Sequence, residues 1–191
     1  MDRKQTGEKS MSKNVGKKFE EQFKNSVPKT ALIYRLPDST NSFSGGVQLR
    51  FTRRNPFDFL IFDTVNRYLY ALELKTVAHK SISFERDTTE NGEIHVHQIR
   101  GLREWNKYNG VRCGFVINFR EIEKTIFIDI DDFNGVISDV DKKSFTIKDL
   151  DEYNVPYKII GQKKMRTRYK YDVEGFLRSF DDETEENNGK F

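Results

Sequence analysis

The sequence has little of what marks a secreted or membrane-bound protein. A single cysteine, Cys113, excludes an internal disulfide and fits a reducing compartment. No apolar run approaches the roughly 20 residues that a membrane-spanning helix needs. The polar, basic stretch 1–18 also lacks the apolar region of a signal peptide. These absences predict a cytoplasmic protein with no membrane partner.

Charged residues, by contrast, are plentiful: they make up 33% of the 191 residues, against 36% hydrophobic residues. The formal net charge of +3 is unevenly distributed, because residues 181–191 hold five acids and one base. This tail therefore carries −4, and residues 1–180 carry +7. A basic body is compatible with nucleic-acid binding, since phosphate contacts dominate such affinity, but many soluble domains are equally basic.

The length predicts one domain with a proper core. We expect a disordered basic arm over residues 1–14, a single folded domain over 15–180 and an acidic, disordered tail over 181–191. The stretch 37–54 contains no long apolar run, and connections of this length are usually functional or disordered. It is either a floppy loop or a basic protrusion. Its basic residues are Arg50, Arg53 and Arg54.

Hydrophobic periodicity indicates a helix, then strands, a second helix and more strands. Val15, Phe19 and Phe23 recur every four residues, which predicts a helix that starts near Asn14 and ends before Pro28. Strands are expected over residues 31–36, 57–62, 68–74, 111–119 and 124–130. Further helices are expected over residues 97–108 and 172–180, and a short one opening at Asp131.

Three stretches fit neither pattern. Residues 76–93 read as a polar loop, residues 149–160 are ambiguous, and residues 163–170 hold five bases and no acid. The order of the remaining elements predicts an α/β domain with a central mixed β-sheet flanked by helices.

The most informative segment is the hairpin predicted between the second and third strands. If its turn consists of the four residues 64–67, Asp58 lies directly opposite Glu73, with Cβ atoms roughly 4.5–5.5 Å apart. Side chains alternate between the two faces of a strand, so Lys75 shares the face of Glu73. The hairpin therefore predicts two carboxylates and a lysine at one place.

Two directly opposed carboxylates destabilise a sheet, and a divalent cation between them reverses this effect. Mg²⁺ is typically held by one or two carboxylates, with water and substrate phosphate completing its shell. Lys75 could then hold or deprotonate an attacking water, or stabilise negative charge on the phosphate. The pattern favours a metal site at Asp58 and Glu73. A plain ion pair between Glu73 and Lys75 is the alternative.

Other titratable residues give weaker signals. Glu20 is either a further carboxylate of the site or part of a solvated helix face. With one cysteine, the histidines form too thin a ligand set for zinc and are interpreted as loop and helix-start residues. They are His79, His95 and His97. Cys113 lies in an apolar strand and is interpreted as a small buried hydrophobe.

Five short segments, taken in order, resemble the RecU family of Holliday junction resolvases, within the wider PD-(D/E)xK nuclease group. The likeness extends from about Gly16 to Phe133 and lies in the order and spacing of the segments. They are Gly16-Lys-Lys-Phe-Glu20, Asn55-Pro-Phe-Asp58, Glu73-Leu-Lys75-Thr, His97-Gln98-Ile99 and Gly114-Phe-Val-Ile-Asn-Phe119.

This resemblance implies a restriction-endonuclease-like core that works as a homodimer. It implies Mg²⁺-dependent hydrolysis of phosphodiester bonds, with Mn²⁺ able to substitute, by paired nicks at four-way DNA junctions. By position, Asp58 and Glu73 would be metal ligands, together with the carbonyl of Leu74, and Lys75 would be the catalytic lysine. Glu20 and Gln98 match the acidic residue and the glutamine of the two helices.

The resemblance also assigns DNA contacts. The stretch 37–54 falls where RecU proteins carry a protruding stalk that engages the junction, so its three arginines become expected DNA contacts. The basic run 163–170 supplies the other expected contacts: Lys163, Lys164, Arg166 and Arg168. In the family a threonine precedes the metal-binding Asp, whereas this chain has Phe57.

Two other functions remain open on the sequence. A restriction or repair nuclease of the same group would share the chemistry and cut ordinary duplex DNA. A DNA-binding accessory module of recombination would bind without cutting. The presence of Asp58, Glu73 and Lys75 together argues for catalysis over the module.

Overall fold

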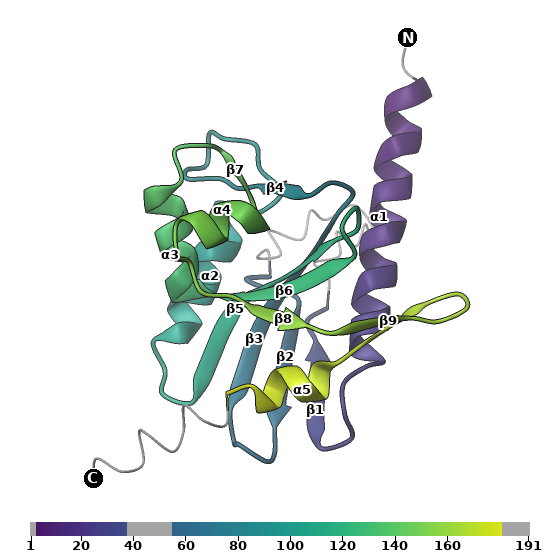
Figure 1. The fold of residues 1–191 in the computed structure, drawn as a ribbon, viewed down its shortest axis with the longest axis vertical. Coiled ribbons are helices and arrows are strands. Elements are labelled where there is room, and N and C mark those ends of the chain that lie inside the picture. The colour runs from purple at the N-terminus through teal and green to yellow at the C-terminus, as the bar shows by residue number, and fades with distance from the viewer. Residues whose placement is uncertain (1–2, 38–54, 181–191) are drawn as a thin grey trace, which may run out of the picture.

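The computed structural model describes residues 3–37 and 55–180 and has a six-stranded mixed sheet at its centre (Figure 1). The strand order is β1-β2-β3-β5-β6-β8, and within it only the β3–β5 pair is parallel. The strands are β1 (Ala31–Arg35), β2 (Phe59–Asp63), β3 (Leu69–Val77), β5 (Val111–Phe119), β6 (Lys124–Asp129) and β8 (Lys158–Ile160). The prediction of an α/β domain with a central mixed sheet flanked by helices is confirmed.

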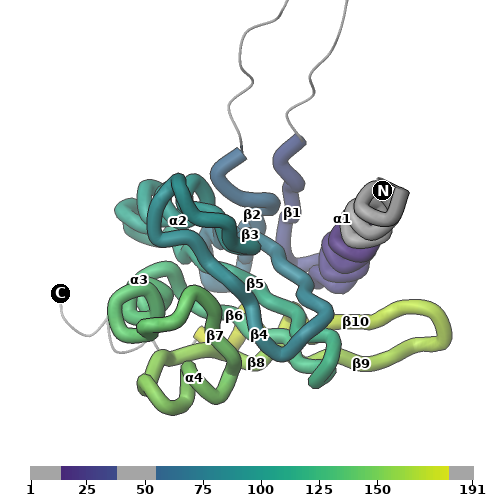
Figure 2. The backbone as a smooth tube through the Cα atoms, turned by 90° about the horizontal axis from the view of Figure 1, so that it is seen from above, coloured from purple at the N-terminus to yellow at the C-terminus, as the bar shows by residue number. Residues whose placement is uncertain are grey.

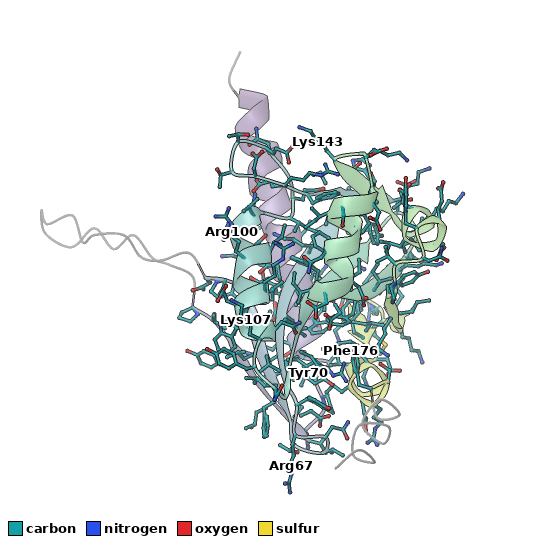
Figure 3. All side chains as sticks on the ribbon, turned by 90° about the vertical axis from the view of Figure 1, so that its left-hand side faces the viewer. Arg67, Tyr70, Arg100, Lys107, Lys143 and Phe176 are labelled. Atoms are coloured by element: carbon teal, nitrogen blue, oxygen red, sulfur yellow. The ribbon has the colours of Figure 1, made fainter. Side chains whose placement is uncertain are left out.

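The two faces of the sheet are covered by different helices (Figures 1 and 2). On one face lie α2 (Val96–Asn106), α3 (Ile130–Asp139) and α4 (Ile147–Glu152), and on the other lie α1 (Arg3–Lys24) and α5 (Val173–Arg178). Each layer has an aromatic centre. Phe115 of β5 packs against Phe133 of α3, with their ring centroids 4.7 Å apart. On the other face, the ring of Tyr70 lies 5.8 Å from that of Phe176 in α5 (Figure 3).

The β2–β3 hairpin has the register that a four-residue turn predicts. Phe62 pairs with Leu69, and Leu60 pairs with Ala71. The main-chain N–H of Asp63 donates to the Tyr68 carbonyl at 2.9 Å and closes the turn. Arg67 ends the turn with a φ of 58° at the tip of the molecule (Figure 3). The regular register ends with Phe59 opposite Leu72, and the N–H of Asp58, just before β2, donates to the Leu72 carbonyl at 3.1 Å.

Two boundaries differ from the sequence-based expectation. The first helix begins at Arg3 instead of near Asn14, so it occupies residues expected to form a disordered arm. That segment is rich in Lys, Gln, Glu and Met, which are good helix formers. The expected loop 76–93 contains the end of β3 and the short strand β4 (Ser81–Ser83), which pairs with β7 (Ser144–Thr146).

In the C-terminal third, both stretches without a clear sequence pattern form regular elements. Residues 149–160 contain most of α4 and the edge strand β8. The basic run forms the hairpin of β9 (Gln162–Lys164) and β10 (Tyr169–Tyr171), which lies beside α1 (Figure 2). The main-chain N–H groups of Tyr169 and Tyr171 donate to Gln22 and Ser26 of the α1 region. The hairpin is therefore attached to the first helix.

The predicted tail 181–191 and all but the first residue of the predicted stretch 37–54 lie outside the described residues, and so do Arg50, Arg53 and Arg54. In the ranges that are described, no helix has the length and apolar character needed to cross a bilayer.

Candidate functional site

The chain at the start of β2 departs from a regular antiparallel ladder. Hydrogen-bonded pairs alternate along such a ladder, so the pairs that begin with Asp63 and Tyr68 would continue to Phe57 and Leu74. Instead, the Leu74 N–H donates to Oδ2 of Asp58 at 2.8 Å. Phe57 turns into the core, edge-on to Trp105 at 5.1 Å. The Asp58 carboxylate thus replaces a backbone acceptor just before the start of β2.

Asp58 is half-buried at this position, and its charge is costly there. Burial is the largest influence and raises the pKa of Asp58 to about 6. The Leu74 N–H lowers it, the Glu20 carboxylate raises it, and the Lys75 and Arg35 cations lower it. Within the described residues, Oδ1 of Asp58 accepts no hydrogen bond, so one oxygen of this carboxylate remains available to a ligand.

Glu73 is the most deeply buried acid of the cluster, with 4% of its surface exposed. Burial raises its pKa to about 8; Lys75 lowers it, and the neighbouring Asp58 carboxylate raises it. The Lys75 Nζ lies 3.1 Å from Oε1 of Glu73. This contact is the ion pair that the sequence also allowed as a plain structural feature. The second carboxylate, Asp58, is what extends it to a candidate site.

Gln98 connects this cluster to helix α2. Its side-chain amide nitrogen donates to Oε1 of Glu73, and its Oε1 accepts from the His95 N–H at 2.9 Å. His95 is the N-cap of α2, and its ring Nδ1 lies 2.7 Å from Oε1 of Glu85. One glutamine side chain therefore both caps a helix and holds the carboxylate of Glu73.

Glu20 approaches from α1, on the other side of the β2 end. Its Oε2 lies 2.7 Å from Nε of Arg35 in β1. It is close enough to raise the pKa of both Asp58 and Glu73. It also lines a cavity of about 310 Å³ between α1 and the edge of the sheet. Glu20 thus lies beside the two carboxylates and is paired to an arginine that sequence reasoning did not single out.

We call this group the carboxylate site: Asp58, Glu73, Lys75, Gln98 and Glu20. Its candidate metal ligands are oxygen atoms, which Mg²⁺ prefers. The main chain of Leu74 is turned toward Asp58, since its N–H donates to that carboxylate. Burial and repulsion from neighbouring carboxylates, Glu20 for Asp58 and Asp58 for Glu73, raise the pKa values of both groups, and a bound cation would favour their charged forms. Across residues 3–37 and 55–180, no three His, Cys, Asp or Glu side chains form a metal-holding group. The fit therefore rests on two carboxylates and a carbonyl.

The remaining predicted residues lie away from this cluster. All four predicted basic contacts of the run 163–170 are exposed on the β9–β10 hairpin. Cys113 is buried, as predicted, and burial raises the pKa of its thiol to about 12. His79 is exposed in the loop after β3. His97 lies in the first turn of α2, where its ring stacks on that of His95 at 5.5 Å.

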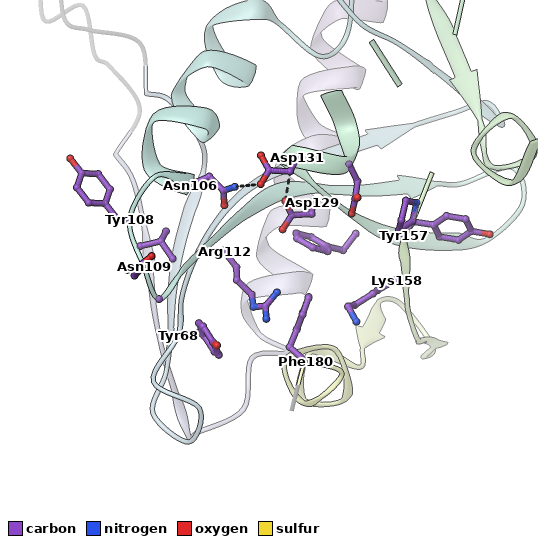
Figure 4. A pocket seen from close by; sticks show the side chains of 15 residues that line it. Tyr68, Asn106, Tyr108, Asn109, Arg112, Asp129, Asp131, Tyr157, Lys158 and Phe180 are labelled. Carbon is purple, nitrogen blue, oxygen red and sulfur yellow. Dashed lines mark hydrogen bonds between the residues drawn. The ribbon is translucent and has the colours of Figure 1, made fainter. Parts of the chain in front are cut away.

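A larger cavity, of about 560 Å³, opens at the opposite ends of β3 and β5 (Figure 4). Arg112 lies there between the rings of Tyr68 and Phe180, at 4.8 and 4.3 Å from their centroids. Asp129 caps α3 in its wall, and burial raises the pKa of this carboxyl to about 6. This cavity shares no lining residue with the carboxylate site.

Comparison with known proteins yields one informative relative. No protein-family description matches the chain. The chain is 31% identical over 163 residues to the SPbeta prophage-derived uncharacterized protein YotM of Bacillus subtilis (strain 168). The similarity covers 84% of this chain and 68% of that protein.

Proposed function

This chain belongs to the family of the SPbeta prophage-derived protein YotM, and from its carboxylate site we propose that it is a metal-dependent DNA endonuclease. The observation that carries the proposal is the Asp58 carboxylate. This carboxylate, just before the first residue of β2, accepts the Leu74 N–H at 2.8 Å, beside a Glu73 that is itself 3.1 Å from Lys75. A structural ion pair between Glu73 and Lys75 does not call for a second carboxylate beside it, whereas Mg²⁺ is commonly held by such a pair.

In this proposal Asp58 and Glu73, with the carbonyl of Leu74, hold Mg²⁺ or Mn²⁺. When bound, the ion supplies Lewis-acid polarisation of the phosphate and lowers the pKa of a coordinated water. Gln98 keeps the Glu73 carboxylate in place through its amide, and the Leu74 N–H does the same for Asp58. These two hydrogen bonds fix both carboxylates before any ligand arrives, which is what preorganisation requires.

Lys75 handles protons and charge. Its Nζ lies at Oε1 of Glu73, on a side chain that is 17% exposed, so it can reach both the carboxylate and a substrate phosphate. There it orients the attacking water and stabilises the negative charge that develops on the phosphate. Glu20 is held by Arg35 at the rim, where it is a further acceptor for water.

The substrate class follows from the resemblance of the sequence motifs to RecU proteins. We propose a four-way DNA junction as the preferred substrate, cut by paired nicks, and a homodimer as the working unit. The finer fold assignment, a restriction-endonuclease-like core, is part of the same proposal. Its support is the mixed sheet with α1 and α2 on opposite faces and the acidic residues at the end of the β2–β3 hairpin.

The test is cleavage of a labelled four-way junction and of linear duplex of the same sequence, with Mg²⁺. The variant is Asp58→Asn, because an asparagine carbonyl can still accept the Leu74 N–H while the charge is removed. Asp141→Asn is the matched control, since Asp141 is an exposed aspartate outside the site. We expect symmetric nicks in the junction by wild type and Asp141→Asn, and at least roughly a 100-fold loss in Asp58→Asn.

The other outcomes are equally informative. Equal cutting of junction and duplex would keep the carboxylate site and change the enzyme to a restriction or repair nuclease. Full activity of Asp58→Asn would refute the site. Binding without cutting under Mg²⁺ or Mn²⁺ would instead leave a DNA-binding accessory module.

A further inference from the structure

A second cavity, which we call the basic groove, lies between α1 and the β9–β10 hairpin. Its volume is about 440 Å³. Five of its lining residues are basic and none is acidic. The basic residues are Lys18, Arg120, Lys164, Arg166 and Arg168. They come from three separate parts of the chain: α1, the β5–β6 turn and the hairpin.

All five basic residues of the groove are exposed. Lys164 has a partner in Glu123, but the two charged atoms are 3.9 Å apart and both side chains are more than half exposed. Such surface pairs contribute little and are screened by salt. Five cations around one concave surface therefore give a positive potential that attracts a polyanion.

Part of the groove lining is polar and fixed, beside apolar side chains such as Val15, Phe19 and Met165. The Thr76 hydroxyl donates to Oδ1 of Asn118 at 3.1 Å, and Nδ2 of Asn118 donates to the Thr125 hydroxyl at 2.8 Å. The Thr125 hydroxyl in turn lies 2.6 Å from Oε1 of Gln162 in β9. This network ties β3, β5, β6 and β9 together, so the hairpin arm is held against the sheet.

One end of the groove meets the carboxylate site along the chain. Thr76, in its lining, directly follows Lys75 in β3, and consecutive Cα atoms are only about 3.8 Å apart. Side chains alternate along β3, so Thr76 faces the groove while Lys75 faces α2 on the other side of the sheet. A phosphate backbone in the groove therefore reaches Lys75 by passing over the edge of β3 beyond Leu72, where the pairing with β2 has ended. A small anion would not need a basic surface that extends from this point to the hairpin tip.

We propose that the basic groove binds the phosphodiester backbone of one DNA strand and leads it to the carboxylate site. The inference rests on the proposed nuclease function and adds to it the path of the substrate. The groove is bounded by α1 on one side and the hairpin on the other. Its cations come from both walls and contact phosphates without reading bases.

Only one of the two faces of the β9–β10 hairpin lines the groove. Lys164 and Tyr169 are directly paired and line the groove. Lys163 and Lys170 are also directly paired, and alternation turns them to the opposite face. Neither lines the groove. Three of the four basic residues predicted to contact DNA in this run line the groove, Lys163 does not, and the proposal adds Lys18 and Arg120.

The experiment compares two double variants that each remove two positive charges. The groove variant is Arg120→Ala with Arg168→Ala, and the control is Lys163→Ala with Lys170→Ala. Binding of a fluorescent single-stranded oligonucleotide and of a four-way junction is measured by anisotropy with EDTA, over a range of salt concentrations. We expect the groove variant to lose at least about 10-fold in affinity and the salt slope to fall by roughly 0.7–0.9 per contact. The control should bind as wild type does.

Equal weakening by both variants, or wild-type binding by the groove variant, would overturn the proposal. So would displacement of the DNA by polyglutamate at equal charge concentration, which would indicate a site for acidic proteins. Parallel cleavage with Mg²⁺ separates the two claims. Groove-dependent binding without cleavage keeps the groove and removes the nuclease function, whereas cleavage unaffected by the groove variant does the reverse.

Discussion

Gly101 of α2 lies directly against Pro56: a Cβ built on Gly101 would be 2.3 Å from the Cβ of Pro56 and 2.8 Å from its Cα. Pro56 precedes Asp58 by two residues. The bare backbone of α2 thus determines where the segment that carries the Asp58 carboxylate can lie. A glycine inside a helix costs stability relative to alanine. Here the glycine is needed because any larger side chain would collide with Pro56.

Gly101→Ala is expected to destabilise the protein by about 1–3 kcal/mol, because the helix and the Pro56 segment must move apart. It should also reduce cleavage by displacing Asp58. Gly16→Ala is the matched control, since nothing lies within 4 Å of a Cβ at that helical position. That control should stabilise by up to about 1 kcal/mol. Urea unfolding measures both, and equal stability of the two variants would contradict the argument.

The stability of the metal-free protein should fall as pH rises. Glu73 has an ordinary pKa near 4.5 that burial raises to about 8, so the folded protein keeps a proton that the unfolded chain releases between these values. Stability is therefore lost from about pH 4.5 up to about pH 8. Glu73→Gln should flatten this dependence, so the Tm of the variant should exceed that of wild type by more at pH 8 than at pH 5. Thermal melts in EDTA at several pH values test this, and parallel pH profiles for variant and wild type would contradict it.

Mg²⁺ should stabilise the folded protein by binding at Asp58 and Glu73. At 100 times its Kd, a ligand that binds only the folded state adds about 2.7 kcal/mol. The increase in Tm should be larger at pH 8 than at pH 5, because protons compete for the same carboxylates below their raised pKa values. Asp58→Asn should lose most of the shift, while Asp141→Asn keeps it. A shift that persists in Asp58→Asn would place the cation elsewhere.

Gln98→Glu separates the two roles of this side chain. A carboxylate can still accept the His95 N–H and cap α2, but it presents an acceptor to Oε1 of Glu73 where the amide donated. We expect near-normal helix content in circular dichroism and at least a roughly 10-fold loss of cleavage. Gln98→Ala, which loses the cap as well, should cost about 0.5–2 kcal/mol of stability. Wild-type cleavage by Gln98→Glu would show that the contact with Glu73 is dispensable.

Local patterns were enough to predict the centre of the fold. The strand over residues 111–119 has the predicted bounds, and the hairpin register follows from its turn. Both rest on continuous apolar runs, which are the strongest signal in a sequence. The hairpin register also brings Asp58 near Glu73, but the ladder ends with Phe59 opposite Leu72 and the Asp58 N–H donates to the Leu72 carbonyl, so the direct pairing of the two carboxylates stays a prediction.

The short, polar elements could not be predicted. Strands β4 and β9 have three residues each, and Lys163 and Lys164 give no alternation of apolar and polar side chains. Their pairing depends on distant partners, such as Gln162 with Thr125. The position of Glu20 beside the carboxylates depends likewise on how α1 crosses the sheet. Its surroundings in the sequence indicate an ordinary solvated helix face.

The hydrogen bond from the Leu74 amide to Asp58 makes a main-chain group a reporter of the carboxylate site. When Asp58 takes up a proton or a cation, the acceptor of this amide changes its charge. The chemical shift and the solvent exchange of a single backbone proton should respond. The titration of the proposed metal ligand can thus be followed in an ordinary nitrogen–proton spectrum, without a substrate and without labelling any side chain.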